Sequence, residues 1–206
     1  MTKYYDDFRG VDNLVYALVT ADDADNYTTG TVKPLIPAAE ISKSTESSSA
    51  TKYYDNKPAI VINSEGADEI SITGAAIPLP VLAEITGKPV DETTGTMIDS
   101  VANPPYVAIG YQYDLTSGDT VYYWRLKGKF SLPDESSATK DDGTDSTGQE
   151  LTYTGISTDH VFTNGNTSAK GIHADTRFQN VNASLFFATV CTPDTLQTNG
   201  VTAKSA

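Results

Sequence analysis

The sequence predicts a mainly β protein, a sandwich or barrel with one flanking α-helix at about residues 78–87 and long loops between strands. Short runs of alternating polar and apolar residues recur along the chain, as expected for strands with one buried face. Turn-forming residues separate these runs, and one segment alone has the spacing of an amphipathic helix. The chain has 206 residues, 38% of them hydrophobic, which is enough to bury a core without disulfides or metals.

Strand patterns follow one another along most of the chain. In residues 68–77, Ile70 and Ile72 oppose the polar side chains between them. The strongest pair lies in residues 105–133, where two β-branched and aromatic runs flank the turn sequence TSGD and predict a β-hairpin. The remaining predicted strands cover residues 13–20, 33–44, 58–65, 150–158 and 182–190.

The predicted helix lies in the sequence IPLPVLAEITGKP. Pro80 is suited to the first turn, and Val81, Leu82 and Ile85 form an apolar stripe. Gly87 is placed to end the helix.

A polar arm, SKSTESSSAT at residues 42–51, connects two of the predicted strands. Hairpin loops usually have about two to five residues. Either this loop is unusually long, or its strands project beyond the sheet. Residues 20–30, 134–149 and 162–171 are also predicted loops, and residues 192–206 are predicted to be mobile or to depend on a partner.

The charge balance is strongly acidic, with 27 acidic and 14 basic residues and a net charge of −13. Such a chain is unsuited to tight nucleic-acid binding, which needs clustered Lys and Arg, but it does not prevent nucleic acid from passing nearby. No apolar run approaches the roughly 18 residues of a membrane span, and no secretory signal is visible. The single cysteine, Cys191, excludes an internal disulfide framework, and we expect folding in a reducing cytoplasm.

No motif in the sequence indicates catalysis, a cofactor or a metal. The two histidines, His160 and His173, lack metal-ligand spacing and are expected to be ordinary surface or loop residues. No nucleophile elbow or phosphate-binding glycine loop is present. Asp23 and Asp25 begin a calcium-loop pattern that fails at Tyr27, so turn carboxylates are favoured over a casual surface cation. The sequence therefore predicts a protein that is not an enzyme.

Aromatic and basic residues leave two questions open. Exposed aromatics could stack on sugars, although cross-strand packing is the favoured explanation; the candidates are Tyr4, Tyr5, Tyr53, Tyr54, Tyr122, Tyr123 and Trp124. Arg125, Lys127 and Lys129 alternate in a predicted strand and are expected on one face. That face is either solvated or an electrostatic seam for an acidic neighbour, such as another copy of the chain.

An ordered set of segments gives the sequence a family resemblance. The sharpest is KGKFSLPDES at residues 127–136, and the likeness runs from about residue 9 to 162. The segments cover residues 9–20, 30–42, 53–59, 70–88, 105–113, 122–140 and 150–156. Together they resemble the major tail protein family of long, non-contractile-tailed bacteriophages, which builds the tail tube.

The resemblance implies a structural virion protein with a tail-tube β-sandwich, formed by residues 1–165. Residues 166–206 would be a C-terminal strand or extension, packed on the same domain or on a neighbouring subunit. Copies would form hexameric rings that stack into a tube, a conduit for genome ejection into the host. The implied partners are the chain itself, a tape measure protein, tail terminator and distal tail proteins, and double-stranded DNA in transit without tight binding. The protein would be made in the host cytoplasm and reside in the phage tail, with no cofactor and no membrane.

The resemblance also assigns expected roles to residues. Subunit-interface charge falls to Arg125, Lys127 and Lys129. The polar lumen face is assigned to Glu40, Glu69, Ser71, Thr73 and Gln112. The contact to the next ring is assigned to Ser42, Lys43, Ser44, Thr45, Glu46, Ser47, Ser48, Ser49 and Lys52. The alternatives are a carbohydrate-binding β-sandwich module and a β-rich hydrolase with dispersed acids.

Overall fold

The computed structural model describes residues 5–91, 93–133 and 148–204. It is mainly β, as the sequence predicts, and it has two short helices where the sequence predicts one. The elements are β1 (Phe8–Asp22), β2 (Tyr27–Thr29), β3 (Lys33–Pro34), β4 (Ala38–Tyr54), β5 (Lys57–Gly74), α1 (Leu79–Thr86), β6 (Val90–Asp91), β7 (Thr96–Met97), β8 (Val107–Leu115), β9 (Thr120–Phe130), β10 (Gln149–Ile156), β11 (Gly171–Asp175), β12 (Gln179–Val181), α2 (Ala183–Phe186) and β13 (Val201–Ala203).

One large antiparallel sheet organises the protein. Its strands run in the order β2-β1-β8-β9-β10-β5-β4, with β3 paired to β1 and β11 paired to β9. The sheet folds over itself, because Tyr16 of β1 and Ile41 of β4 share one core although they lie near opposite ends of the strand order. The Tyr113 hydroxyl of β8 donates a hydrogen bond to the Ile41 carbonyl oxygen at 3.0 Å. The two halves of the sheet therefore face each other, as in a β-sandwich.

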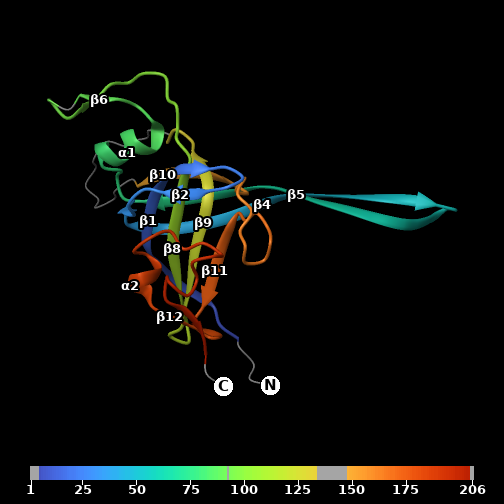
Figure 1. The fold of residues 1–206 in the computed structure, drawn as a ribbon. Helices are drawn as coiled ribbons and strands as arrows, with labels where there is room; N and C mark the ends of the chain where they lie inside the picture. The colour runs from blue at the N-terminus through green and yellow to red at the C-terminus, as the bar shows by residue number, and fades with distance from the viewer. Residues whose placement is uncertain (1–4, 92, 134–147, 205–206) are drawn as a thin grey trace, which may run out of the picture.

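The enclosed face of the sheet forms the first core. Strands β5 and β10 contribute Ile70, Ile72, Leu151 and Tyr153, which have no more than traces of exposed surface. Helix α1 covers one end of this core with Ile85, and Figure 1 shows the helix at the end of the body opposite β12. The predicted helix is therefore confirmed, and it ends as expected in a left-handed residue at Gly87 (φ 67°).

The outer face of β1, β8 and β9 forms a second core with the C-terminal part of the chain. Trp124 of β9 is fully buried there against Phe186, and its indole N–H donates to the Phe186 carbonyl oxygen at 3.0 Å. Val190, Cys191 and Val201 complete the packing. Burial raises the pKa of the Cys191 thiol to about 12, so it acts as a small apolar side chain.

Two predictions for the C-terminal region are wrong. Residues 182–190 are not a strand: Asn182 caps helix α2 by accepting a hydrogen bond from the Leu185 N–H. The tail is not mobile over residues 192–204, because β13 pairs with β12. The buried Asn199 side chain also donates hydrogen bonds to the carbonyl oxygens of Leu185 and Thr189.

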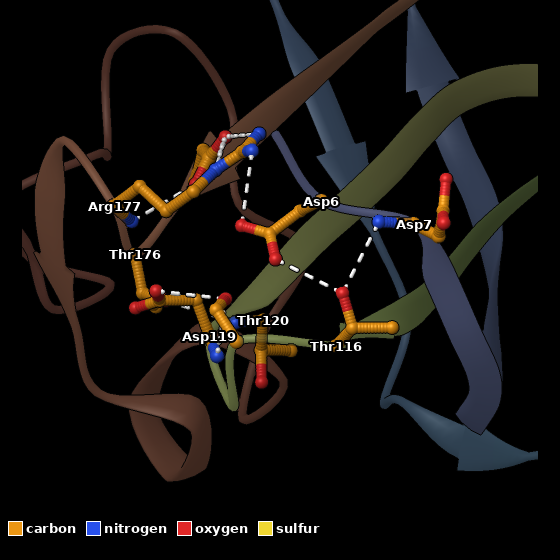
Figure 2. A network of polar contacts seen from close by, with 9 residues as sticks. Asp6, Asp7, Thr116, Asp119, Thr120, Thr176 and Arg177 are labelled. Atoms are coloured by element: carbon orange, nitrogen blue, oxygen red, sulfur yellow. Dashed lines mark hydrogen bonds and ion pairs between the residues drawn. The ribbon is translucent and has the colours of Figure 1, made fainter. Parts of the chain in front are cut away.

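A polar network joins three chain segments at the end of the body where β8 turns into β9. The Thr116 hydroxyl donates to Asp6 at 3.0 Å and accepts from the Asp7 N–H, as Figure 2 shows. Arg177 lies 3.6 Å from the same Asp6 carboxylate, and the Thr176 hydroxyl donates to Asp119. The network holds the chain before β1 and the β11–β12 turn against the predicted β8–β9 turn.

The close approach of Gly110 to Trp124 gives a prediction. A Cβ at residue 110 would lie 2.9–3.0 Å from the indole ring, so Gly110→Ala forces the packed ring to shift. We expect a loss of about 1–3 kcal/mol in the free energy of unfolding, measured by urea denaturation. The matched control is Gly10→Ala, a strand glycine with nothing within 4 Å of the added Cβ. Equal stabilities of the two variants would contradict the packing argument.

Candidate interaction site: the β4–β5 arm, its base and the polar face

Strands β4 and β5 form a hairpin that extends far beyond the body of the protein (Figure 1). Pairing runs from Ala38↔Gly74 to Tyr54↔Lys57. Asp55 and Asn56 make the turn with positive φ angles of 51° and 60°, as a two-residue hairpin turn of type I′ requires. Of the two alternatives for the polar segment, projecting strands are therefore observed. We call residues 46–66 the arm.

Every residue of the arm is exposed. Hydroxyl side chains dominate the part nearest the body, where the Ser48 and Ser64 hydroxyls hydrogen-bond across the strands at 2.6 Å. The outer part carries exposed large apolar side chains beside Lys52 and Lys57, and these are Tyr53, Tyr54, Ile60, Val61 and Ile62. Because a lone domain gains nothing by exposing such a group, the outer part of the arm is a candidate surface for contact with another molecule.

An ionic cluster around one buried carboxylate, the arm base, anchors the arm in the body. Its centre is Asp68 of β5, which is 2% exposed. The Thr45 hydroxyl donates to Asp68 at 2.8 Å, and the Lys43 ammonium lies 3.3 Å from the same carboxylate. Arg125 of β9 approaches it at 3.5 Å, and Lys170 from the segment before β11 approaches at 3.4 Å.

The cluster keeps the Asp68 carboxylate ionised. Burial alone would raise its pKa, but the hydrogen bonds from Thr45 and Lys43 and the charges of Lys43 and Lys170 outweigh burial. The pKa of Asp68 is therefore below its usual value of 3.8. Since the ionised form is favoured by folding, this contribution to stability is present above the unfolded-state pKa and is lost at lower pH.

A polar face covers the outer side of β4, β5 and β10. Residues directly opposite each other in antiparallel strands share a face. Ser42 lies opposite Ser71, which lies opposite Thr152 on β10. The neighbouring rows are Glu40–Thr73–Glu150 and Ser44–Glu69–Thr154. This side of the three strands therefore presents only hydroxyls and carboxylates, while Ile41 and Ile72 point into the first core.

The structure distributes the expected lumen and ring-contact residues over these three parts. Glu40, Glu69, Ser71 and Thr73 share the polar face, whereas Gln112 lies apart on β8, opposite Asp12 and Tyr122. The expected ring-contact residues fall into three groups: Ser42 and Ser44 on the polar face, Lys43 and Thr45 in the arm base, and Glu46, Ser47, Ser48, Ser49 and Lys52 on the arm.

The prediction that Arg125, Lys127 and Lys129 share one strand face is wrong. Val107 pairs with Gly128 and Ile109 with Arg125, so two residues of β9 oppose Ala108 alone. This bulge breaks the period-two alternation. Arg125 consequently points to Asp68, while Lys127 and Lys129 lie over the Tyr106 ring at 4.8 and 4.6 Å.

Two of these charges are also compensated within the chain. Lys127 is 5% exposed and pairs with Asp22 at 2.6 Å and Asp159 at 2.7 Å. Burial opposes ionisation of Asp22, but hydrogen bonds from Lys127 and from the Asp159 and His160 N–H groups lower its pKa. Lys127 and Arg125 are therefore parts of the fold, and Lys129 is the residue of the three that lies in a row with the polar face, opposite Thr154.

The sugar-stacking candidates are divided by burial. Trp124 is 0% exposed and Tyr122 is 8% exposed, so neither offers a ring face to a ligand. Tyr53 and Tyr54 are exposed, but they lie on the arm and not in a hollow of the body. Tyr4 lies outside the described residues.

The remaining chemical candidates do not form a reactive site in the part of the chain that the structure describes. No group of three or more His, Cys, Asp or Glu side chains is arranged there to hold a metal ion. Asp23 accepts the N–H groups of Asp25 and Asn26 and so serves its turn, as expected. The predicted loop at residues 134–149 falls largely on residues 134–147, outside the described residues. Among the described helices, none is long and apolar enough to cross a membrane.

Sequence reasoning missed several residues of the site. Ile60 and Ile62 were assigned to an ordinary strand, although their Pro-Ala-Ile-Val-Ile run has no polar alternation to mark a buried side. The β10 members of the polar face, Glu150 and Thr152, could have been found from the alternation in ELTYTGI. Nothing in the sequence points to Asp68 or Lys170, because their pairing depends on contacts across about a hundred residues.

Comparison with known proteins does not assign the chain to a family. The sequence matches no protein-family model and no curated protein.

The arm base gives a prediction for pH dependence. Asp68→Asn leaves the surrounding cations without their carboxylate, and at pH 7 we expect a loss on the order of 3 kcal/mol in the free energy of unfolding. As the pH falls below about 4, the parent protein loses the same contribution, so the two stabilities converge. Urea denaturation at several pH values measures this. The control is Glu69→Gln, an exposed neighbour on the same strand, which should leave the profile unchanged. A constant gap at all pH values would refute the assignment.

Proposed function

We propose that this protein is a tail-tube subunit of a long-tailed bacteriophage, a structural protein that forms rings and stacks them into a hollow tube. Its site of action would be the virion, after synthesis in the host cytoplasm. The observation that carries the proposal is the arm, a long exposed ribbon with an apolar end. In a stacked tube, the arm of one subunit would lie against a subunit of the next ring.

The physics of a two-stranded ribbon favours a partner. An isolated hairpin is at best marginally stable in water, because it has no third layer to bury its side chains. Here Ile60 and Ile62 lie on one side of the ribbon and Val61 on the other. Both sides therefore gain from being covered, and repeated copies of one chain would provide the same cover at every level of the tube.

The sheet supports ring formation in the same way. Strand β4 ends the strand order, and within the described residues no strand pairs with its outer edge. An uncovered edge of this length invites pairing with another chain. A head-to-tail contact of this kind gives a ring if the rotation between copies closes.

The polar face is the surface best suited to line a DNA conduit. Glu40, Glu69 and Glu150 would repel phosphates, and the hydroxyls between them offer no fixed positive charge. Repulsion at physiological ionic strength reaches about 8 Å, so it would act as DNA nears the wall. A wall of Lys and Arg would instead bind the phosphates and slow the passage of the genome.

The alternative, a carbohydrate-binding module, has less support. A sugar platform needs exposed rings in a concave or flat site, and Trp124 and Tyr122 are buried. Of the exposed candidates, Tyr5 lies before β1, and the neighbouring pair Tyr53 and Tyr54 belongs to the arm. Glycan binding that is lost on replacement of this pair would favour the alternative.

The arm is tested by a deletion that preserves the register. Ser47 and Glu65 lie directly opposite each other, so replacing residues 48–64 with Asn-Gly closes a short hairpin and keeps the arm base. We expect the variant to fold with an unchanged melting temperature and to form no tubes. Negative-stain microscopy of concentrated protein measures tube formation.

The parent protein, which should form rings or tubes under the same conditions, is the control. Normal tubes from the shortened chain would remove the arm from the stacking contact. Monodisperse monomers from the parent under all conditions would overturn the tail-tube function itself.

The lumen assignment is tested by chemical access. Glu69→Cys places a thiol on the polar face, while the native Cys191 is buried and serves as an unreactive background. We expect a small maleimide to label residue 69 in free protein and in tubes. A bulky polymer-conjugated maleimide should label it in free protein alone. Equal labelling of tubes by the bulky reagent would place residue 69 on the outside.

A further inference from the structure

The arm meets the body only at its base, so its direction depends on few contacts. The last pair between β5 and β10 is Asp68↔Gly155. Beyond it, the ribbon consists of β4 and β5 alone, and every residue from 46 to 66 is exposed. Ten strand residues span about 33 Å, so a 10° rotation at the base moves the end of the arm by about 6 Å.

A bulge lies at this point. Thr45 pairs with Asp68 and Ser47 with Glu65, so Glu46 faces both Gly66 and Ala67. Bulges bend and twist a strand pair locally. The two strands are close here, since a Cβ at Gly66 would lie 3.0 Å from the Glu46 Cβ. The bulge is therefore where the arm would rotate if nothing else held it.

We infer that Lys170 and Asp68 fix the direction of the arm in the free subunit, before it meets another subunit. Lys170 belongs to the segment before β11 and so reaches the arm from the body. Its ammonium lies 2.7 Å from the Glu65 carboxylate, donates to the Gly66 carbonyl oxygen at 2.5 Å and lies 3.4 Å from Asp68. These contacts span the bulge, because Glu65 lies on its outer side, Gly66 within it and Asp68 on its inner side.

Asp68 is held from the other direction by Arg125. The guanidinium lies 3.5 Å from the carboxylate, and its Nε donates to the Tyr111 hydroxyl at 3.3 Å. Tyr111 is buried in the first core, so this side of the cluster is rigid. Strand β5 is thus clamped between β9 and Lys170 at the residue where it leaves the body.

The advantage of a fixed arm rests on the proposed function. A subunit whose arm already points in the binding direction loses less conformational freedom on association, and this raises affinity without new contacts. Lys170 is a positioning residue in this scheme, because it acts through the geometry of Glu65 and Asp68.

The test measures the arm directly in the free subunit. Spin labels are attached to Thr51→Cys on the arm and Thr154→Cys on β10, both exposed, and the distance distribution is recorded by pulsed electron paramagnetic resonance. Sedimentation confirms that the sample is monomeric. Labelling of the parent without introduced cysteines checks that the buried Cys191 does not react.

We expect a narrow distribution for the otherwise unchanged protein and a width that is about doubled by Lys170→Met, which removes the charge and keeps the length. Lys170→Arg should restore the narrow distribution. The matched control is Lys33→Met, which removes an ion pair of the same 2.7 Å length to Glu84, away from the arm. The inference is overturned if the unchanged protein is as broad as Lys170→Met, or if Lys33→Met broadens it equally.

The outcome is independent of tube formation. A narrow distribution that broadens in Lys170→Met supports the inference even if no tubes form, and in that case the tail-tube proposal alone fails. If the protein forms tubes and the distance distribution is the same with and without Lys170→Met, the tail-tube proposal stands and the positioning role of Lys170 is refuted.

Discussion

Strand β9 is buried on both faces and pairs on both edges, and most of the structure is attached to it. One edge pairs with β8, and the other pairs with β11 in its first half and β10 in its second. Trp124 packs into the second core, whereas Tyr123 packs against the first. The bulge opposite Ala108 lets the strand pass from one partner to the other while both faces stay covered.

The same strand explains where the basic residues go. Around Arg125 and Lys127 the strand is covered on both faces, so a cation there needs an internal partner. Arg125 forms an ion pair with Asp68 of β5. Lys127 forms ion pairs with Asp22 at the end of β1 and with Asp159 after β10. These ion pairs connect β9 to the arm base and to the chain beyond β10. The polar face, in contrast, carries the carboxylates of Glu40, Glu69 and Glu150.

The sequence predicted the parts of the fold that depend on local pattern. The β8–β9 hairpin, helix α1 and the alternation of Ile70 and Ile72 need only neighbours along the chain. The failures depend on contacts between distant segments. Residues 192–204 are polar enough to suggest a free tail. Val201 is nevertheless buried in the second core, and the buried Asn199 side chain bonds to Leu185 and Thr189. The bulge in β9 has no residue signature, so the pairing of Arg125 with Asp68 could not be predicted.

The composition of the arm suits a segment that must exist both free and covered. Ser and Thr side chains can hydrogen-bond to water in the free subunit and to another chain after association. Neither state therefore leaves a buried polar group without a hydrogen bond. The apolar residues at the outer part, Tyr53 and Ile60 among them, supply a driving force for covering of roughly 25 cal/mol per Å² of apolar surface. An arm made only of such residues would expose a flat apolar ribbon to indiscriminate pairing. The hydroxyls near the body therefore keep the arm soluble, and the apolar side chains near the tip favour contact with another chain. The ionic arm base joins the arm to the body and so determines the direction in which the apolar end points.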